Sequence, residues 1–100
     1  MPRKKKLLWS GPAFEDLREI REHVSLDNPS AARLLAKRIR QCVTRLREHS
    51  GSGRIVPEFE PLGYREVIVS PYRIVYAVQK GAVVVLRVWH GRRDLTDQST

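Results

Sequence analysis

The sequence predicts an α+β fold: a short strand, two helices, and then a three- or four-stranded antiparallel sheet with both helices packed on one face. Two observations support this prediction. Between residues 12 and 48 apolar residues recur every three or four positions, which is the spacing of amphipathic helices. From residue 64 onward the chain holds three runs rich in β-branched and aromatic residues. One hundred residues, 41% of them hydrophobic, suffice for a single domain built in two layers.

The amino-terminal part is expected to contain a short strand and a first helix. Residues 7–9 are apolar and precede the turn signal Ser10-Gly11-Pro12, which favours a short opening strand. Pro12 has the fixed φ that suits the first helical position. The helix is expected over residues 12–24. Its apolar stripe consists of Phe14, Leu17, Ile20 and Val24.

A second helix is expected to follow almost at once. Asn28 can cap its free amide groups, and Pro29 loses no hydrogen bond at the first helical position. The helix is expected to reach about Glu48. Its apolar stripe consists of Ala32, Leu35, Ile39, either Cys42 or Val43, and Leu46. Because so few residues join the two helices, they should form an antiparallel hairpin, and residues 50–53 should form a loop.

The rest of the chain predicts the sheet. Strands are expected over residues 64–69, 72–78 and 82–89, with connections short enough for an antiparallel meander. A further short strand is possible over residues 54–56. If Ile74 and Tyr76 face the helices, Arg73 projects from the opposite face of the sheet. The same alternation does not decide which face of the sheet Arg65 lies on, because either side of its strand could belong to the core.

The chain carries a formal net charge of +8, which favours a polyanionic partner, with nucleic acid first and an acidic protein second. Residues 1–50 hold 12 basic and 6 acidic residues, whereas residues 51–100 hold 7 and 5, so the excess lies on the arm and the helices. Cys42 has no second cysteine to pair with, which fits a reducing, cytoplasmic location. The longest unbroken apolar run, residues 82–86, is too short to span a membrane.

Several segments together resemble the RelE/ParE superfamily, the toxins of bacterial type II toxin–antitoxin pairs. The resemblance rests on the order of elements and on four motifs. These are Asn28-Pro29-Ser30-Ala31-Ala32, Gly53-Arg54-Ile55-Val56-Pro57-Glu58, Pro71-Tyr72-Arg73-Ile74-Val75-Tyr76 and Leu86-Arg87-Val88-Trp89-His90-Gly91-Arg92-Arg93. It implies one RelE/ParE-like toxin domain over residues 1–100. The basic arm at 1–6 and the polar tail at 95–100 are expected to be flexible. The resemblance also implies a cognate antitoxin as partner.

The resemblance implies one of two activities. RelE-like members cleave ribosome-bound mRNA without a metal or cofactor, which requires a base, a cation beside the phosphorane and an acid. On this leading hypothesis Glu58 is the base, Arg73 with Arg65 stabilises the phosphorane, and His90 is the acid. The phosphates of the RNA would be held by Arg54, Arg92 and Arg93.

ParE-like members instead poison DNA gyrase by binding, and two features of the sequence keep this alternative open. Gly91 follows His90, where mRNA-cleaving relatives commonly carry a tyrosine, and residues 51–63 contain no lysine of the kind that RelE itself uses. A third hypothesis is a degenerate member that binds its antitoxin and is no longer toxic.

Each candidate residue also has a purely structural interpretation. Glu58 could be a solvated loop carboxylate, Arg73 an arginine paired with Glu66, Glu58 or a helix carbonyl, and His90 a polar residue at a strand end. The three histidines lie on three different elements without the spacing of metal ligands, so no metal site is expected. Cys42, on the apolar stripe of the second helix, is expected to act as a small buried hydrophobe.

Overall fold

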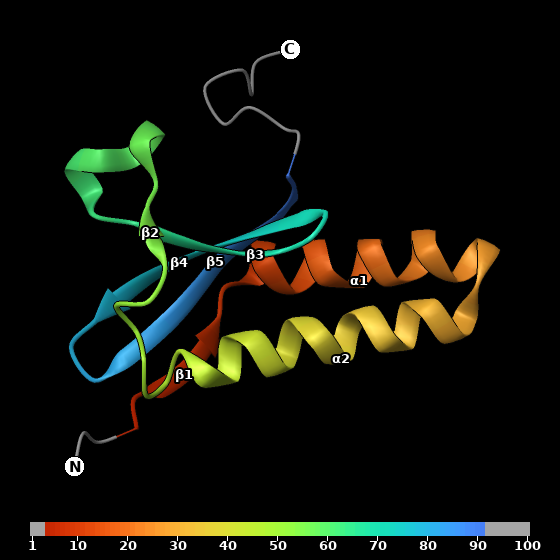
Figure 1. The fold of residues 1–100 in the computed structure, drawn as a ribbon, viewed down its shortest axis with the longest axis horizontal. Helices are drawn as coiled ribbons and strands as arrows, with labels where there is room; N and C mark the ends of the chain where they lie inside the picture. Colours follow the sequence, from red (N-terminus) through yellow and green to blue (C-terminus); the bar gives the residue numbers. More distant parts are fainter. Residues whose placement is uncertain (1–3, 92–100) are drawn as a thin grey trace.

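The computed structural model describes residues 4–91 and confirms the predicted α+β class (Figure 1). Strand β1 (Lys6–Trp9) leads into helices α1 (Gly11–Asp27) and α2 (Pro29–Arg45). Strand β2 (Arg54–Ile55) and the short 3₁₀ segment η1 (Pro57–Leu62) follow. The meander consists of β3 (Arg65–Val69), β4 (Tyr72–Gln79) and β5 (Ala82–His90).

Both helices begin at side-chain caps that the sequence supplies. Ser10 Oγ accepts a hydrogen bond from the Ala13 amide at 3.0 Å, and Asn28 Oδ1 accepts one from the Ala31 amide at 3.0 Å. The predicted Asn28 cap is therefore confirmed. Since Asn28 alone separates the helices, they run antiparallel, side by side.

The helix boundaries differ from the prediction at three points. The first helix begins at Gly11 and continues to Asp27, which places Pro12 at its second position. The second helix ends at Arg45 rather than Glu48, because residues 46–48 tighten into a turn with i→i−3 hydrogen bonds such as Leu46 N to Val43 O at 3.0 Å. Ala13, and not Phe14, shares the buried face of α1 with Leu17, so Phe14 is 63% exposed.

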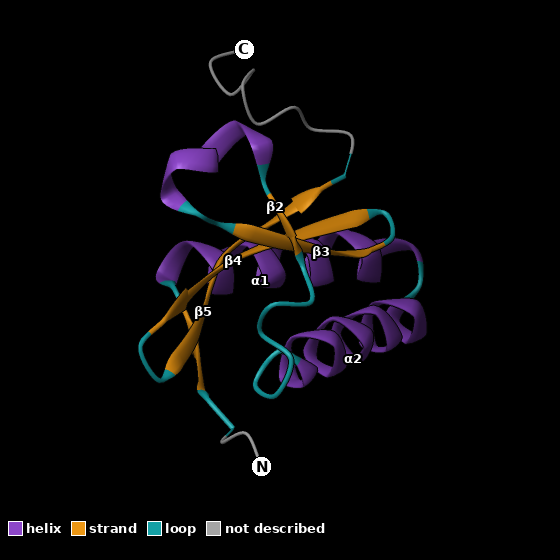
Figure 2. Cartoon of the chain, turned by 60° about the vertical axis from the view of Figure 1, so that its left-hand side comes forward, coloured by secondary structure: helices purple, strands orange, loops and turns teal. Residues whose placement is uncertain are grey.

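The sheet has the order β1-β5-β4-β3-β2, and the helical hairpin covers one of its faces (Figure 2). Neighbouring strands of the meander are antiparallel, as predicted, and β1 pairs in parallel with β5 from Lys6↔Ala82 to Trp9↔Val85. Lys5 precedes β1 and is tied to the end of the helical hairpin, because its amide donates to the Arg47 carbonyl at 2.9 Å. Among the described residues, no helix has the length and apolar character needed to cross a membrane.

The main core lies between the sheet and the helices. Ile39 and Val43 of α2 pack with Ile74 and Tyr76 of β4. Further residues of β3 and β5 belong to the same core. Cys42, predicted to be buried, is only partly so and packs against the rim of this core. Burial raises the pKa of its thiol above the ordinary value.

A register shift in β5 changes which of its side chains reach the main core. Val75 pairs with Arg87 but the next residue, Tyr76, pairs with Val85, so Leu86 is an extra residue in β5. Val85 and Val88 both face the helices despite a spacing of three residues.

A second, smaller cluster occupies the other face of the sheet, where η1 folds over it. Val56, Val75 and Trp89 form its buried part, and Phe59, Tyr64 and Leu86 pack around them. The face opposite the helices is therefore partly covered, and the candidate site lies at the edge of this cover.

Candidate functional site

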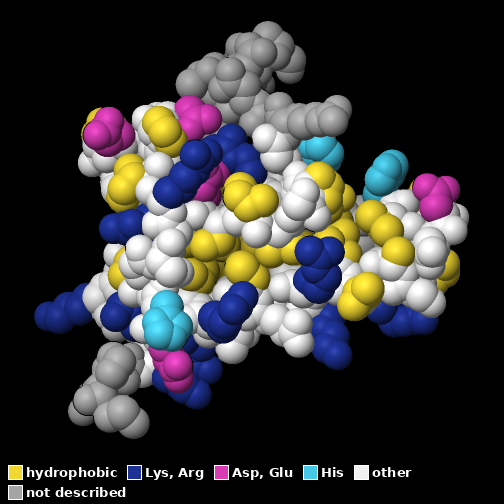
Figure 3. Space-filling view, in the orientation of Figure 1, with side chains coloured by type: hydrophobic (Ala, Val, Ile, Leu, Met, Phe, Trp, Pro, Cys, Tyr) yellow, Lys and Arg dark blue, Asp and Glu magenta, His cyan; other side chains and the backbone are white. Residues whose placement is uncertain are grey.

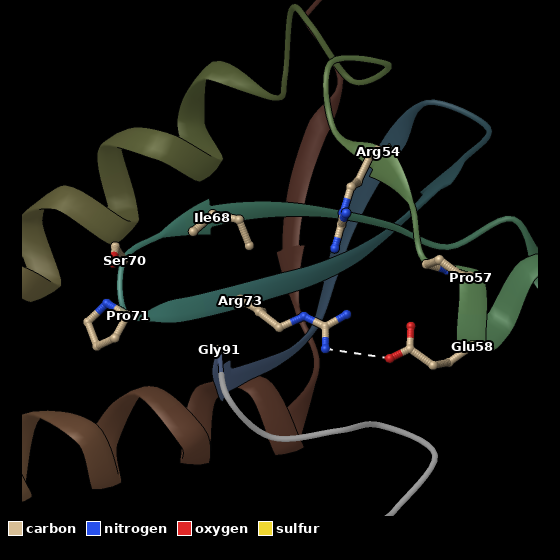
Figure 4. A pocket seen from close by; sticks show the side chains of 8 residues that line it. All are labelled: Arg54, Pro57, Glu58, Ile68, Ser70, Pro71, Arg73 and Gly91. Atoms are coloured by element: carbon tan, nitrogen blue, oxygen red, sulfur yellow. Dashed lines mark ion pairs between the residues drawn. The ribbon is translucent and has the colours of Figure 1, made fainter.

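A pocket of about 630 Å³ lies on the face of the sheet opposite the helices (Figure 4). Residues from β2, η1, β3, the turn between β3 and β4, β4 and the position after β5 surround it. They are Arg54, Pro57, Glu58, Ile68, Ser70, Pro71, Arg73 and Gly91. Of the residues predicted for catalysis or RNA binding, Glu58, Arg73 and Arg54 meet here.

A buried carboxylate organises the arginines of the pocket. Glu66, on β3, is 1% exposed, and its Oε1 accepts from Arg73 Nε at 2.5 Å while its Oε2 accepts from Arg54 Nε at 2.5 Å. Burial by itself would raise the pKa of Glu66, but the hydrogen bonds and positive charges of the two arginines outweigh burial and hold that pKa below its ordinary value. Glu66 is thus an anion that fixes both guanidinium groups.

Arg73 reaches from β4 toward a second carboxylate. Its Nη1 lies 3.6 Å from Glu58 Oε2, the ion pair marked in Figure 4. Burial opposes the charge of Arg73, which is 7% exposed, but Glu66 and then Glu58 more than compensate and raise its pKa above the ordinary value. Two arginines and two carboxylates thus form a network without net charge.

Arg65 lies on the other face of the sheet, away from this network. It pairs in register with Tyr76, whose side chain belongs to the main core, so Arg65 faces the helix side. Its Nη1 donates to the Gly53 carbonyl at 2.7 Å and to the Gly51 carbonyl at 3.3 Å. Arg65 therefore contacts the loop before β2, while Arg73 points into the pocket.

His90 also lies on the helix side. It pairs in register with Tyr72, which packs against the main core, and the two rings meet edge to face with centroids 5.8 Å apart. His90 lines a separate cavity of about 240 Å³ together with Asp16, Glu19 and His23 of α1. The four predicted catalytic residues are therefore divided between the two faces of the sheet, and Arg92 and Arg93 lie outside the described residues.

The loop before β2 is held by a buried tyrosine. Tyr76 Oη donates to the Ser50 carbonyl at 2.7 Å and accepts from the Gly53 amide at 2.9 Å. A Cβ at Gly53 would lie 2.5 Å from Tyr76 Oη and 2.6 Å from the Glu66 carbonyl oxygen, so this close approach requires glycine. These two hydrogen bonds of Tyr76 fix the loop directly before β2 and thereby the position of Arg54.

Glu66 is the site residue that sequence reasoning missed, having been considered only as a partner for Arg73. The sequence did contain a signal, because Glu66 is a carboxylate inside the β-branched run 65–69. A carboxylate in a buried strand must be paired with a positive charge, so Glu66 should have been expected to hold an arginine. No three His, Cys, Asp or Glu side chains within residues 4–91 are grouped closely enough to hold a metal ion.

Comparisons with known proteins agree with this architecture. Residues 7–95 match the family model of the ParE toxin of type II toxin–antitoxin systems. Toxin RelE2 of Caulobacter vibrioides is 33% identical over 89 residues, which cover 88% of this chain and 97% of that relative. A chain of the chromosomal ParDE toxin–antitoxin system of P. aeruginosa superposes with a TM-score of 0.73 at 26% identity, covering 87% of this chain and 96% of that chain. The protein belongs to the ParE toxin family, within the RelE/ParE superfamily of type II toxins.

Proposed function

We propose that this toxin arrests growth in the cytoplasm by binding DNA gyrase, as ParE-like members do, rather than by cutting mRNA. The observation that carries the proposal is the division of Glu58 and Arg73 from Arg65 and His90 by the sheet. Metal-free RNA cleavage needs a base, a cation and an acid around one phosphate, and side chains on opposite faces cannot surround one.

The charges of the site support the same conclusion. Arg73 is buried and paired with Glu66 and Glu58, so a phosphate approaching it would meet two carboxylates as well as the guanidinium. The basic surface of α2 offers a separate docking region, with Arg33, Lys37 and Arg38 among its exposed residues. Charge at such a surface steers a partner and needs no catalytic group.

A supercoiling assay with purified toxin and gyrase tests the proposal. We expect inhibition of supercoiling that saturates with toxin, together with growth arrest when the toxin is expressed alone. Full gyrase activity at saturating toxin would refute it. Glu58→Gln should inhibit gyrase as well as wild type does, because the carboxylate has no role in a binding mechanism. Glu60→Gln, a change of the same kind at an exposed residue of η1, is the matched control.

One observation favours ribosome-dependent mRNA cleavage as a second candidate: Glu58, Arg73 and Arg54 line one pocket. In that mechanism Glu58 would take the 2′-hydroxyl proton beside Arg73. Primer extension on ribosome-bound mRNA, run on the same preparation, distinguishes the two functions. Cuts that disappear in Glu58→Gln but persist in Glu60→Gln would replace the gyrase proposal with this one.

A further inference from the structure

One side of α2 carries a line of basic side chains, which we call the basic row. It consists of Arg33, Lys37 and Arg40 of α2 and of Arg47 in the turn that follows the helix. Spacings of four, three and seven residues keep these positions on one side of the helix axis. The first three are exposed, and within residues 4–91 no member of the basic row forms an ion pair. In Figure 3, Lys and Arg side chains lie along the lower margin of the molecule, below the position of α2 in Figure 1.

One end of the basic row lies beside α1. A hollow of about 410 Å³ separates the two helices there, and Arg21 and Arg33 are among the residues that line it. Glu22 also lines this hollow, but its carboxylate is paired with Arg18 at 3.0 Å. Arg21 is exposed and forms no ion pair with any residue in 4–91. Arg21 therefore adds a further unneutralised charge next to Arg33.

The other end of the basic row meets the basic arm. Arg47 Nε donates to the Lys5 carbonyl at 2.8 Å, and the Lys5 amide donates to the Arg47 carbonyl at 2.9 Å. Both acceptors are neutral, so these bonds hold the two residues together without cancelling a charge. The positive surface is thus continued from α2 onto the segment that leads into β1.

The opposite side of α2 differs in character. Arg38 and Arg45 line the groove toward β3, and Leu34, 59% exposed, lies one turn before Arg38. Apolar anchors beside charges are typical of protein interfaces, and no exposed large apolar residue of α2 lies among the members of the basic row. The helix also holds no aromatic residue on which an unpaired base would stack. The basic row therefore suits a regular phosphate backbone better than a protein or a single strand.

We infer that the basic row binds the phosphate backbone of duplex DNA. From Arg33 to Arg47 the row is about 20 Å long at 1.5 Å per helical residue. Over that length one strand of B-DNA presents about six phosphates, enough for each cation to meet one. Such contacts position a protein without reading bases. This inference rests on the proposed function for the source of the DNA, which gyrase would hold, but binding of the toxin to DNA requires no gyrase.

Fluorescence anisotropy with a labelled duplex and free toxin measures this binding. Arg33→Gln combined with Arg40→Gln should weaken it by about tenfold or more and lower the slope of log affinity against log salt by about two, because two phosphate contacts are lost. The matched control is Arg38→Gln with Arg45→Gln, which removes the same charge from the same helix, at the same spacing, on the side that faces β3. Equal weakening in both double variants, or no binding by wild type at low salt, would overturn the inference.

A measurement on the unaltered protein applies even if a variant fails to fold. Duplex DNA should slow acetylation of Lys37 several-fold, whereas Lys80, exposed in the turn between β4 and β5, should react equally with and without DNA. Equal acetylation of Lys37 in both conditions would overturn the inference. Tighter binding of single-stranded RNA than of duplex DNA would overturn it in favour of RNA. Protection of Lys37 by gyrase but not by DNA would overturn it in favour of a protein partner.

Supercoiling assays separate this inference from the gyrase proposal. Arg33→Gln with Arg40→Gln should need about tenfold more toxin for half-inhibition than Arg38→Gln with Arg45→Gln, in line with its weaker DNA binding. A toxin that binds DNA through the basic row and leaves gyrase fully active would refute the gyrase proposal alone. Inhibition of gyrase by a toxin that binds no DNA would refute the role of the basic row alone.

Discussion

Glu66 Oε1 and Arg73 Nε lie 2.5 Å apart on neighbouring strands, and the side chain of Glu66 has no exposed surface. Removing one member of a buried pair leaves the other charge without compensation. Glu66→Ala should therefore lower the free energy of unfolding by about 3–5 kcal/mol, measured by urea denaturation. Glu60→Ala, at an exposed position of η1, should change it by no more than about 0.5 kcal/mol. A similar small loss for Glu66→Ala would show that Arg73 does not depend on this carboxylate.

The depressed pKa of Glu66 makes the stability of the fold dependent on pH. A carboxyl whose pKa is lower in the folded state stabilises it above the unfolded pKa, near 4.5, and that contribution is lost as pH falls through the folded value. The difference in unfolding free energy between wild type and Glu66→Gln should be constant near neutral pH and shrink below about pH 4.5. A difference that stays constant down to pH 2.5 would contradict this sign.

Tyr76→Phe should destabilise the protein by about 1–3 kcal/mol, because it leaves the Gly53 amide and the Ser50 carbonyl without their hydrogen-bond partner. Thermal unfolding of the variant beside wild type measures the effect. Tyr64→Phe is the control, since Tyr64 is half-buried and its hydroxyl makes no hydrogen bond with residues 4–91. Equal melting temperatures for the two variants would refute the anchoring role of Tyr76.

Asp16 connects α1 to β5 at three points. Its carboxylate accepts from Arg87 Nε at 2.7 Å, Arg87 Nη2 at 2.9 Å and the Val88 amide at 2.9 Å. We expect Asp16→Ala to cost about 2–3 kcal/mol of unfolding free energy, since the hydrogen bonds to Asp16 are charge-assisted. Glu19→Ala, one turn further along α1, serves as the reference in the same denaturation experiment. A loss no larger than that of Glu19→Ala would show that the contact is not stabilising.

His90→Ala should leave growth arrest and gyrase inhibition within about twofold of wild type, because His90 lines a cavity against α1 that contains none of the exposed basic residues of α2. A titrated induction experiment, with toxin amount followed by immunoblot, provides the measurement. Complete loss of toxicity at equal toxin abundance would show that the His90 side chain is needed for toxicity. A loss explained by lower abundance would be visible in the blot and would instead indicate a role in folding.

The fold was predictable because local signals and periodicity agreed. The Asn28-Pro29 start of α2, the alternation of Ile74 and Tyr76, and the short connections of the meander each point to one structure. The Leu86 bulge and the burial of Ala13 rather than Phe14 were not predictable, because the first belongs to the pairing of β5 with β4 and the second to the packing of α1 against the core. Neither is encoded in a window of neighbouring residues.

The candidate site was predictable only in part. Glu58, Arg73 and Arg54 line one pocket because β2 and β4 both pair with β3 and η1 directly follows β2. Arg65 and His90 lie on the other face because they pair in register with Tyr76 and Tyr72, whose side chains face the helices. The sequence alone does not fix this register, and a shift by one residue would reverse the face of each side chain. Glu66 was missed because the burial of a carboxylate depends on two arginines distant in sequence.

The parallel pairing of β1 with β5 has a consequence for synthesis on the ribosome. β1 leaves the exit tunnel before the other described strands and finds its partner only in residues 82–85 of β5. The sheet described here cannot close while the carboxyl-terminal strand is still inside the tunnel. The sheet of a nascent toxin is therefore incomplete until residues 82–85 have left the tunnel and can pair with β1.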